Sequence, residues 1–179
     1  MPLPAAHVPP VSESAHAART LLGELGGVHC NLFSHLQALE DLSSAPSVDS
    51  IALANARWKL GQASLSRGLL AGRICEFFLS RCNPDQATAL KSLRDAGHEL
   101  LRQSATHIGK WTAESIARDW IGYCRDDRGI RRRIRAHIAA EQSLLYPLLE
   151  RLTASRGING NGASDGTRTR DLRRDRPAL

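Results

Sequence analysis

Residues 130–152 read IRRRIRAHIAAEQSLLYPLLERL, and this stretch decides the fold. Its apolar residues recur at intervals of three and four, which is the spacing that places side chains on one face of an α-helix. The apolar positions are Ile130, Ile134, Ile138, Leu145, Leu148 and Leu152. The stretch therefore predicts an amphipathic helix with one face turned toward a core.

Three segments upstream show the same helical periodicity, and none of them alternates with a period of two. They cover residues 12–42, 47–81 and 84–111. Asn83 followed by Pro84 is typical of a helix start, and Thr112 can cap a short segment that reaches Tyr123. The last helix is expected to begin near Asp126. Four helices with short connections predict an all-α fold, an antiparallel up-down four-helix bundle, over residues 12–153.

Composition limits the class of protein. A chain of 179 residues fits one domain, and 42 % hydrophobic residues with only 4 % aromatics favour helices. No apolar run approaches the roughly 20 residues of a membrane span. The four cysteines form no CxxC pair, and the N-terminus has no signal-peptide pattern, so we expect reduced thiols in a soluble, cytoplasmic protein without a membrane partner.

Both chain ends are expected to be disordered, at residues 1–11 and 154–179. The second end is rich in Gly, Asn, Asp and Arg, and from Arg156 onward six arginines against three aspartates contribute +3 of the net charge of +6. This basic tail resembles the ends of bacterial reading frames that run into a structural-RNA gene. Its charge therefore does not predict a nucleic-acid partner.

His137 and Glu141 are the first candidate site. They are four residues apart, so both side chains lie on the helix face that also carries Ile134 and Ile138. A buried glutamate is costly unless it is paired, hydrogen-bonded or bound to a metal. The spacing predicts a metal-binding pair, with a half-exposed His–Glu hydrogen bond as the alternative.

The stretch HIAAEQSLLYPLLERL resembles the HxxxEExxLYPxL signature of the hemerythrin-like, or HHE cation-binding, family. The resemblance extends to AGHELLRQSATHIGKWTAESIARDW and GGVHCNLFSHLQALEDL, and in all it covers roughly residues 15–153. It implies a four-helix bundle whose usual site holds two irons. The ligands of that site are one His from the first helix, HxxxE from the second, one His from the third and HxxxE from the fourth. Carried over by position, the ligands here would be His29, His98, His137 and Glu141.

The second helical segment departs from the family pattern. It contains no histidine, and its stretch ARWKLGQASLSRGLLAGRICEFFLSRC has Glu76 as its only acid and several basic residues, Arg67 among them. Three outcomes remain: a single Fe or Zn ion held by three His and one Glu, a site that adds a cysteine such as Cys75 or Cys30, or no metal at all. Gly61, Gly68 and Gly72 are expected to permit a close approach of helices where the missing ligands would stand.

The sequence contains partial signals of two other classes of function. His107 precedes Lys110 by three residues, the spacing of a histidine phosphotransfer domain, but it lies at the end of its helix. Arg131, Arg132 and Arg133 lack the interleaved aromatic residues that stack on single-stranded nucleic acid. The sequence therefore predicts a hemerythrin-like binding or sensory domain rather than an enzyme. Its alternative is a metal-free interaction module with an unidentified protein partner.

Overall fold

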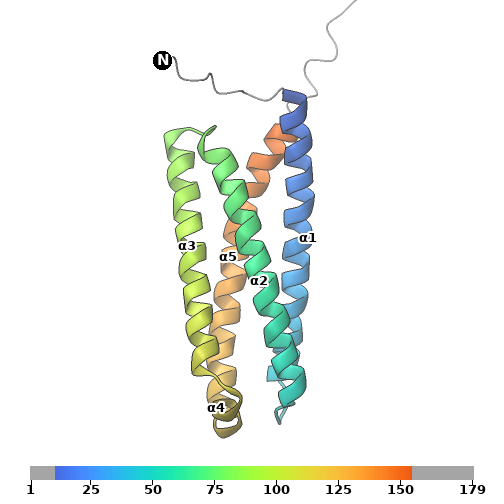
Figure 1. The fold of residues 1–179 in the computed structure, drawn as a ribbon, viewed down its shortest axis with the longest axis vertical. Coiled ribbons are helices and arrows are strands. Elements are labelled where there is room, and N and C mark those ends of the chain that lie inside the picture. The colour runs from blue at the N-terminus through green and yellow to red at the C-terminus, as the bar shows by residue number, and fades with distance from the viewer. Residues whose placement is uncertain (1–10, 155–179) are drawn as a thin grey trace, which may run out of the picture.

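The computed structural model describes residues 11–154, and these residues form helices joined by short connections, with no strand among them. The helices are α1 (Val11–Ser43), α2 (Ser50–Leu79), α3 (Pro84–Lys110), α4 (Ala113–Arg118) and α5 (Trp120–Ala154). Figure 1 shows the four long helices side by side, with the short α4 at one end. The prediction of an all-α fold is confirmed.

The helix boundaries follow local capping. Asn83 accepts a hydrogen bond from the backbone N–H of Gln86 at 2.9 Å and so caps α3, as the sequence predicts. The expected start of the last helix near Asp126 is wrong, because α5 already begins at Trp120. Asp119 is the reason: its carboxylate accepts from the N–H of Gly122 at 2.7 Å and satisfies one of the free donors of the first turn.

The two expected end segments can be compared with the structure only at their edges. Val11 is the first residue of α1 and Ala154 the last residue of α5, so the helices reach one residue into each segment. Residues 1–10 and 155–179 lie outside the described residues. Within the described helices, no segment is both long enough and apolar enough to cross a membrane.

Each long helix packs mainly against two others. The main pairs are α1 with α2, α2 with α3, α3 with α5, and α5 with α1, and α2 also touches α5. Buried side chains inside this ring form two apolar clusters. One includes Leu32, Leu60 and Ile134, and the other includes Leu25, Leu70 and Leu145. Between the two clusters, each of α1, α2 and α5 has a buried polar residue in place of an apolar one. These residues are His29 on α1, Arg67 on α2 and Glu141 on α5. The core is therefore interrupted by one polar layer.

The glycines do not play the role expected of them. A Cβ added at Gly61 or Gly72 would meet nothing within 4 Å, so the prediction of a close helix approach is wrong at these positions. At Gly68 the nearest atom is a Leu101 methyl at 3.4 Å, an ordinary contact. The close approach occurs on α3 instead, where a Cβ at Gly97 would lie 3.2 Å from His137 Nε2. Gly97 thus leaves space for the His137 ring.

Candidate functional site

Glu141 is the centre of the polar layer. It is 1 % exposed, and both of its carboxylate oxygens have partners. His29 Nε2 lies 2.8 Å from Oε2, and Arg67 Nη1 donates to Oε1 at 2.6 Å. His137 Nε2, one helical turn before Glu141, lies 3.3 Å from Oε1. Side chains from α1, α2 and α5 therefore converge on one buried carboxylate.

His29 links this carboxylate to Tyr146. The Tyr146 hydroxyl lies 3.1 Å from Nδ1 of His29, and the two rings stack with their centroids 5.8 Å apart. A neutral imidazole that carries its hydrogen on Nε2 satisfies both contacts, because Nε2 then donates to Glu141 while Nδ1 accepts from the tyrosine. Both ring nitrogens of His29 are thus engaged within the protein.

Arg67 supplies the positive charge that the buried carboxylate needs. The arginine is itself 1 % exposed, so its guanidinium and Glu141 form an ion pair inside the core. An unpaired ion at this depth would cost several kcal/mol. In the sequence, Arg67 is one of several basic residues of the second helical segment, and neither its ion pair with Glu141 nor the contact of Tyr146 with His29 was predicted.

The pKa of Glu141 reflects these contacts. Burial raises it, but hydrogen bonds from His137 and His29 and the positive charge of Arg67 outweigh the burial and lower it to about 2. Glu141 is consequently ionised at neutral pH. Since the carboxylate is stabilised by donors and a fixed cation, it does not depend on a metal ion to remain charged.

The four predicted metal ligands are brought together in part. His29, His137 and Glu141 meet at the polar layer, whereas His98 is exposed and lies beside them in the wall of a neighbouring pocket. No group of three or more His, Cys, Asp or Glu side chains among residues 11–154 is arranged to hold a metal ion. Arg67 lies against the carboxylate where a metal would bind, and a guanidinium has no lone pair to offer. As placed, these residues do not fit a metal ion.

The two cysteines considered as extra ligands do not improve the fit. Cys30 is exposed. Cys75 lines the same pocket as His98. Burial, and to a smaller extent the negative charge of Glu141, raise the pKa of its thiol to about 11. Metals bind the thiolate, and this environment makes removal of the Cys75 proton harder than for an ordinary cysteine, so it disfavours Cys75 as a ligand.

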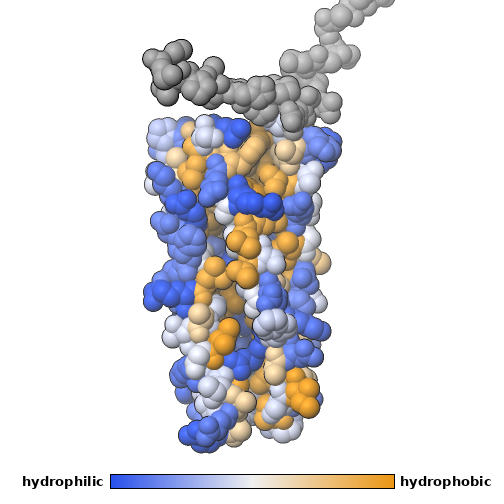
Figure 2. Space-filling view, viewed as in Figure 1, coloured by the Kyte–Doolittle hydropathy of each residue, from blue (hydrophilic) through white to orange (hydrophobic). Residues whose placement is uncertain are grey.

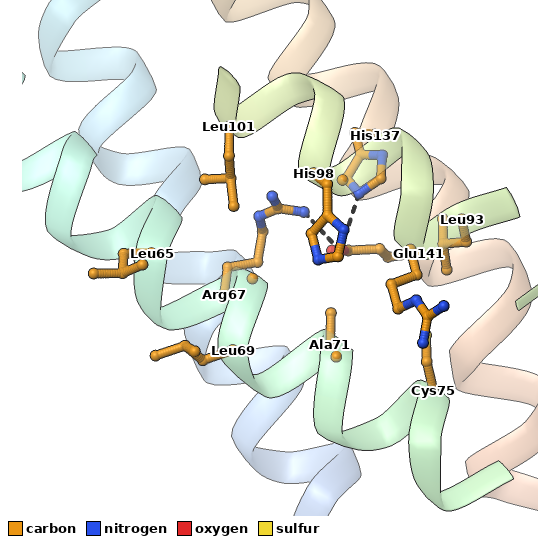
Figure 3. Close-up of a pocket in the computed structure, with 14 residues that line it drawn as sticks. Leu65, Arg67, Leu69, Ala71, Cys75, Leu93, His98, Leu101, His137 and Glu141 are labelled. Carbon is orange, nitrogen blue, oxygen red and sulfur yellow. Dashed lines mark hydrogen bonds and ion pairs between the residues drawn. The ribbon is translucent and has the colours of Figure 1, made fainter. Parts of the chain in front are cut away.

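The pocket beside the polar layer is a cavity of about 120 Å³ between α2 and α3. Arg67, His98, His137 and Glu141 form its polar lining together with Arg94, and leucines form much of the rest. Figure 3 shows the side chains of Arg67, His98 and His137 gathered around Glu141, with Leu65 and Leu69 of α2 to one side. On the outer surface, Figure 2 shows apolar residues along the middle of this face of the molecule.

A second group of charges lies closer to α4. The buried Asp127 accepts from the buried Arg131 Nε at 2.7 Å, and the partly exposed Arg135 donates to the partly exposed Glu40 at 2.6 Å. Arg131 and Arg135 are therefore both engaged with acids of the protein itself. His107 is 13 % exposed and lies 3.9 Å from Asp127, whereas a phosphotransfer histidine must be accessible. Burial lowers the pKa of His107, and the nearby Asp127 only partly offsets this.

Comparisons with family models, with curated proteins and with solved structures found no match to this chain.

Proposed function

We propose that this chain is a hemerythrin-like bundle in which an arginine has replaced the metal, and that it acts as a metal-free binding module. The order of the helices in Figure 1 supports an antiparallel up-down arrangement. Helices α1 and α5 contribute His29, His137 and Glu141, which are three of the four ligands that the family resemblance implies. The second helix, which lacks the family's ligands, contributes Arg67 at the position facing the carboxylate.

The observation that carries this proposal is the contact of 2.6 Å between Arg67 Nη1 and Glu141 Oε1 inside the core. A fixed guanidinium neutralises the carboxylate, and the bundle then keeps its shape without an ion. The pocket next to this pair is the site where a ligand reaches the polar layer. Its lining offers hydrogen-bond donors and apolar surface but no arrangement of catalytic groups, so binding is the activity we assign to it.

Metal content tests the proposal directly. The untagged protein is purified from cells grown with added iron and zinc, and its metals are determined by elemental analysis. We expect no stoichiometric metal. About one ion per chain, lost on Glu141→Ala, would refute the metal-free proposal and establish the single-ion alternative predicted from the sequence.

Substitution of Arg67 provides the reverse test. Arg67→His removes the competing charge and adds a nitrogen ligand next to His29, His137 and Glu141, so we expect this variant to bind Zn²⁺ or Co²⁺. Arg67→Lys is the matched control, because it retains a cation and should bind neither metal. A cobalt absorption spectrum typical of nitrogen and oxygen ligands in the first variant alone is the expected readout.

A further inference from the structure

Helix α2 is apolar on two opposite faces. Its inner face packs into the core through buried residues such as Leu60 and Ile74. Its outer face carries four large apolar side chains, each of them at least half exposed, which we call the outer stripe. They are Ile51, Trp58, Leu65 and Leu69. A helix that is apolar all round is normally buried all round, so the outer stripe is expected to have a covering partner.

The outer stripe forms one continuous line along the helix. At about 100° and 1.5 Å per residue, its four members lie within about 40° of one another and span about 27 Å of the helix axis. Between Lys59 and Arg73 the only charged residue is Arg67, which is buried. Figure 2 shows apolar residues in a band along the middle of this face, where Figure 1 places α2. Single exposed leucines need no explanation, but a continuous apolar band indicates a surface of association.

A groove runs beside the outer stripe, along the seam between α2 and α3. It consists of three open hollows in a row, of which the first and second share Leu101 and the second and third share Gly61. Its α2 side is low, because a Cβ added at Gly61 or Gly72 would meet nothing within 4 Å. On the α3 side it is bordered by the exposed Ile108. The same surface therefore carries projecting apolar side chains and an apolar groove that can receive them.

A surface with both features is complementary to itself. A two-fold axis brings one patch onto the same patch of a second copy, so that the outer stripe of each copy lies in the groove of the other. When the axis is perpendicular to α2, the two α2 helices run antiparallel. If Trp58 then lies over Gly68 of the second copy, Leu65 lies over its Gly61, because seven residues forward on one helix correspond to seven residues back on the other.

Charge favours the antiparallel arrangement. A parallel pair would place Lys59 and Arg73 of one copy opposite the same residues of the other, and like charges at close range repel. In the antiparallel pair described above, the two Lys59 residues are about 12 Å apart along the helix axes and the two Arg73 residues are farther apart. The apolar stripes can therefore meet without bringing like charges together.

The area of the patch is sufficient for a specific dimer. The outer stripe and Ile108 together expose on the order of 500 Å² of apolar side chain, judged from their exposed fractions. Two copies bury this area twice, which gives about 1,000 Å², the lower end of the range for a specific interface. Trp58 is 67 % exposed, and tryptophans at the centre of an interface typically carry much of the affinity.

We propose that the outer stripe and the adjoining groove form a homodimer interface, in which the α2 helices of two copies run antiparallel and Trp58 of each copy lies over the glycines of the other. This inference names the partner for the binding function proposed above. It rests on that function in assigning binding to this groove, because the pocket beside Arg67 is one end of it.

Sedimentation velocity of the full-length protein between roughly 1 and 100 µM tests the interface. We expect a reversible equilibrium between monomer and dimer. Trp58→Glu should weaken dimerisation at least about tenfold, because it replaces the central apolar side chain with a charge. Ile121→Glu is the matched control. Ile121 is 81 % exposed but lies on α5 outside the groove, so its replacement should leave the dimer unchanged.

Filling the groove provides an independent test. Gly61→Gln should also weaken dimerisation at least about tenfold, because the new side chain occupies the space that the second copy needs. The monomer has room for it and gains helix propensity, so urea unfolding should show a stability equal to that of the unaltered protein or higher.

Three results would overturn the proposal. They are a monomer at the highest concentration, a dimer that persists unchanged in Trp58→Glu and Gly61→Gln, or a dimer that Ile121→Glu weakens as much as Trp58→Glu does. The metal determination separates the two proposals. A metal-free monomer would leave the proposed replacement of the metal standing and remove the dimer. A dimer with stoichiometric metal would remove the metal-free proposal and leave the interface.

Discussion

Arg67→Met keeps an unbranched apolar stem but is shorter than arginine, and it removes the charge that faces Glu141. The carboxylate then stays buried, with His29 and His137 as its remaining partners. Removing one member of a buried ion pair typically costs about 3–5 kcal/mol, because the other charge is left without compensation. For a domain of this size we expect the melting temperature to fall by roughly 6–20 °C.

A double-mutant cycle separates the ion pair from the packing of the arginine stem. Glu141→Gln alone leaves the guanidinium buried without its carboxylate and is expected to cost a similar amount. In the double variant neither charge remains, and the glutamine amide still contacts His29. We expect the double variant to be more stable than the sum of the single effects predicts, by about 2 kcal/mol.

The assay is urea unfolding at pH 7, followed by the far-ultraviolet circular dichroism of the helices. Arg73→Met on the same helix is the control, because Arg73 is 67 % exposed and lies 3.5 Å from the half-exposed Glu24. An exposed pair of this kind contributes at most about 1 kcal/mol. A loss below about 1 kcal/mol for Arg67→Met, or strictly additive effects in the cycle, would refute the reasoning.

Two further predictions concern the same layer. The pKa of Glu141 lies at about 2 in the folded protein and near 4.5 in the unfolded chain, so the stability it contributes is complete above pH 4.5 and is lost as the pH falls toward 2. The loss should approach about 3 kcal/mol and should be absent from Glu141→Gln; equal acid sensitivity of the two proteins in urea titrations would contradict this. Tyr146→Phe removes the hydroxyl next to His29 Nδ1 and should cost about 1 kcal/mol, measured in the same assay. An unchanged urea midpoint in that variant would mean that water replaces the hydroxyl without loss.

The helices were predictable because their periodicity is a local property of the sequence. The start of α5 was not predictable in this way. Asp126-Asp127 resembles an acidic first turn, but Asp119 is the residue that caps the helix. Asp127 is instead buried against Arg131. Local signals of this kind identify a helix reliably but leave several candidates for its first residue.

The candidate site was predictable from α1 and α5, where His29, His137 and Glu141 lie on apolar faces, and they do meet in the structure. Arg67 was missed because basic residues are usually exposed. A signal was nevertheless present. Arg67 falls at helical spacing among the buried residues Leu60, Ala63, Leu70 and Ile74, on the stripe that faces the core. A charged residue on such a stripe indicates a buried partner before the structure is known.

The polar layer between the two apolar clusters also fixes the alignment of the helices along their axes. Leucine-rich faces alone would tolerate sliding, because one leucine replaces another after each turn. Moving α5 by one turn, about 5.4 Å, would carry Glu141 away from Arg67 and His29 and place its charge among leucines. Such a misaligned packing would bear the cost of two separated buried ions, several kcal/mol each. The charges that interrupt the core thus set the register in which the rest of the core packs.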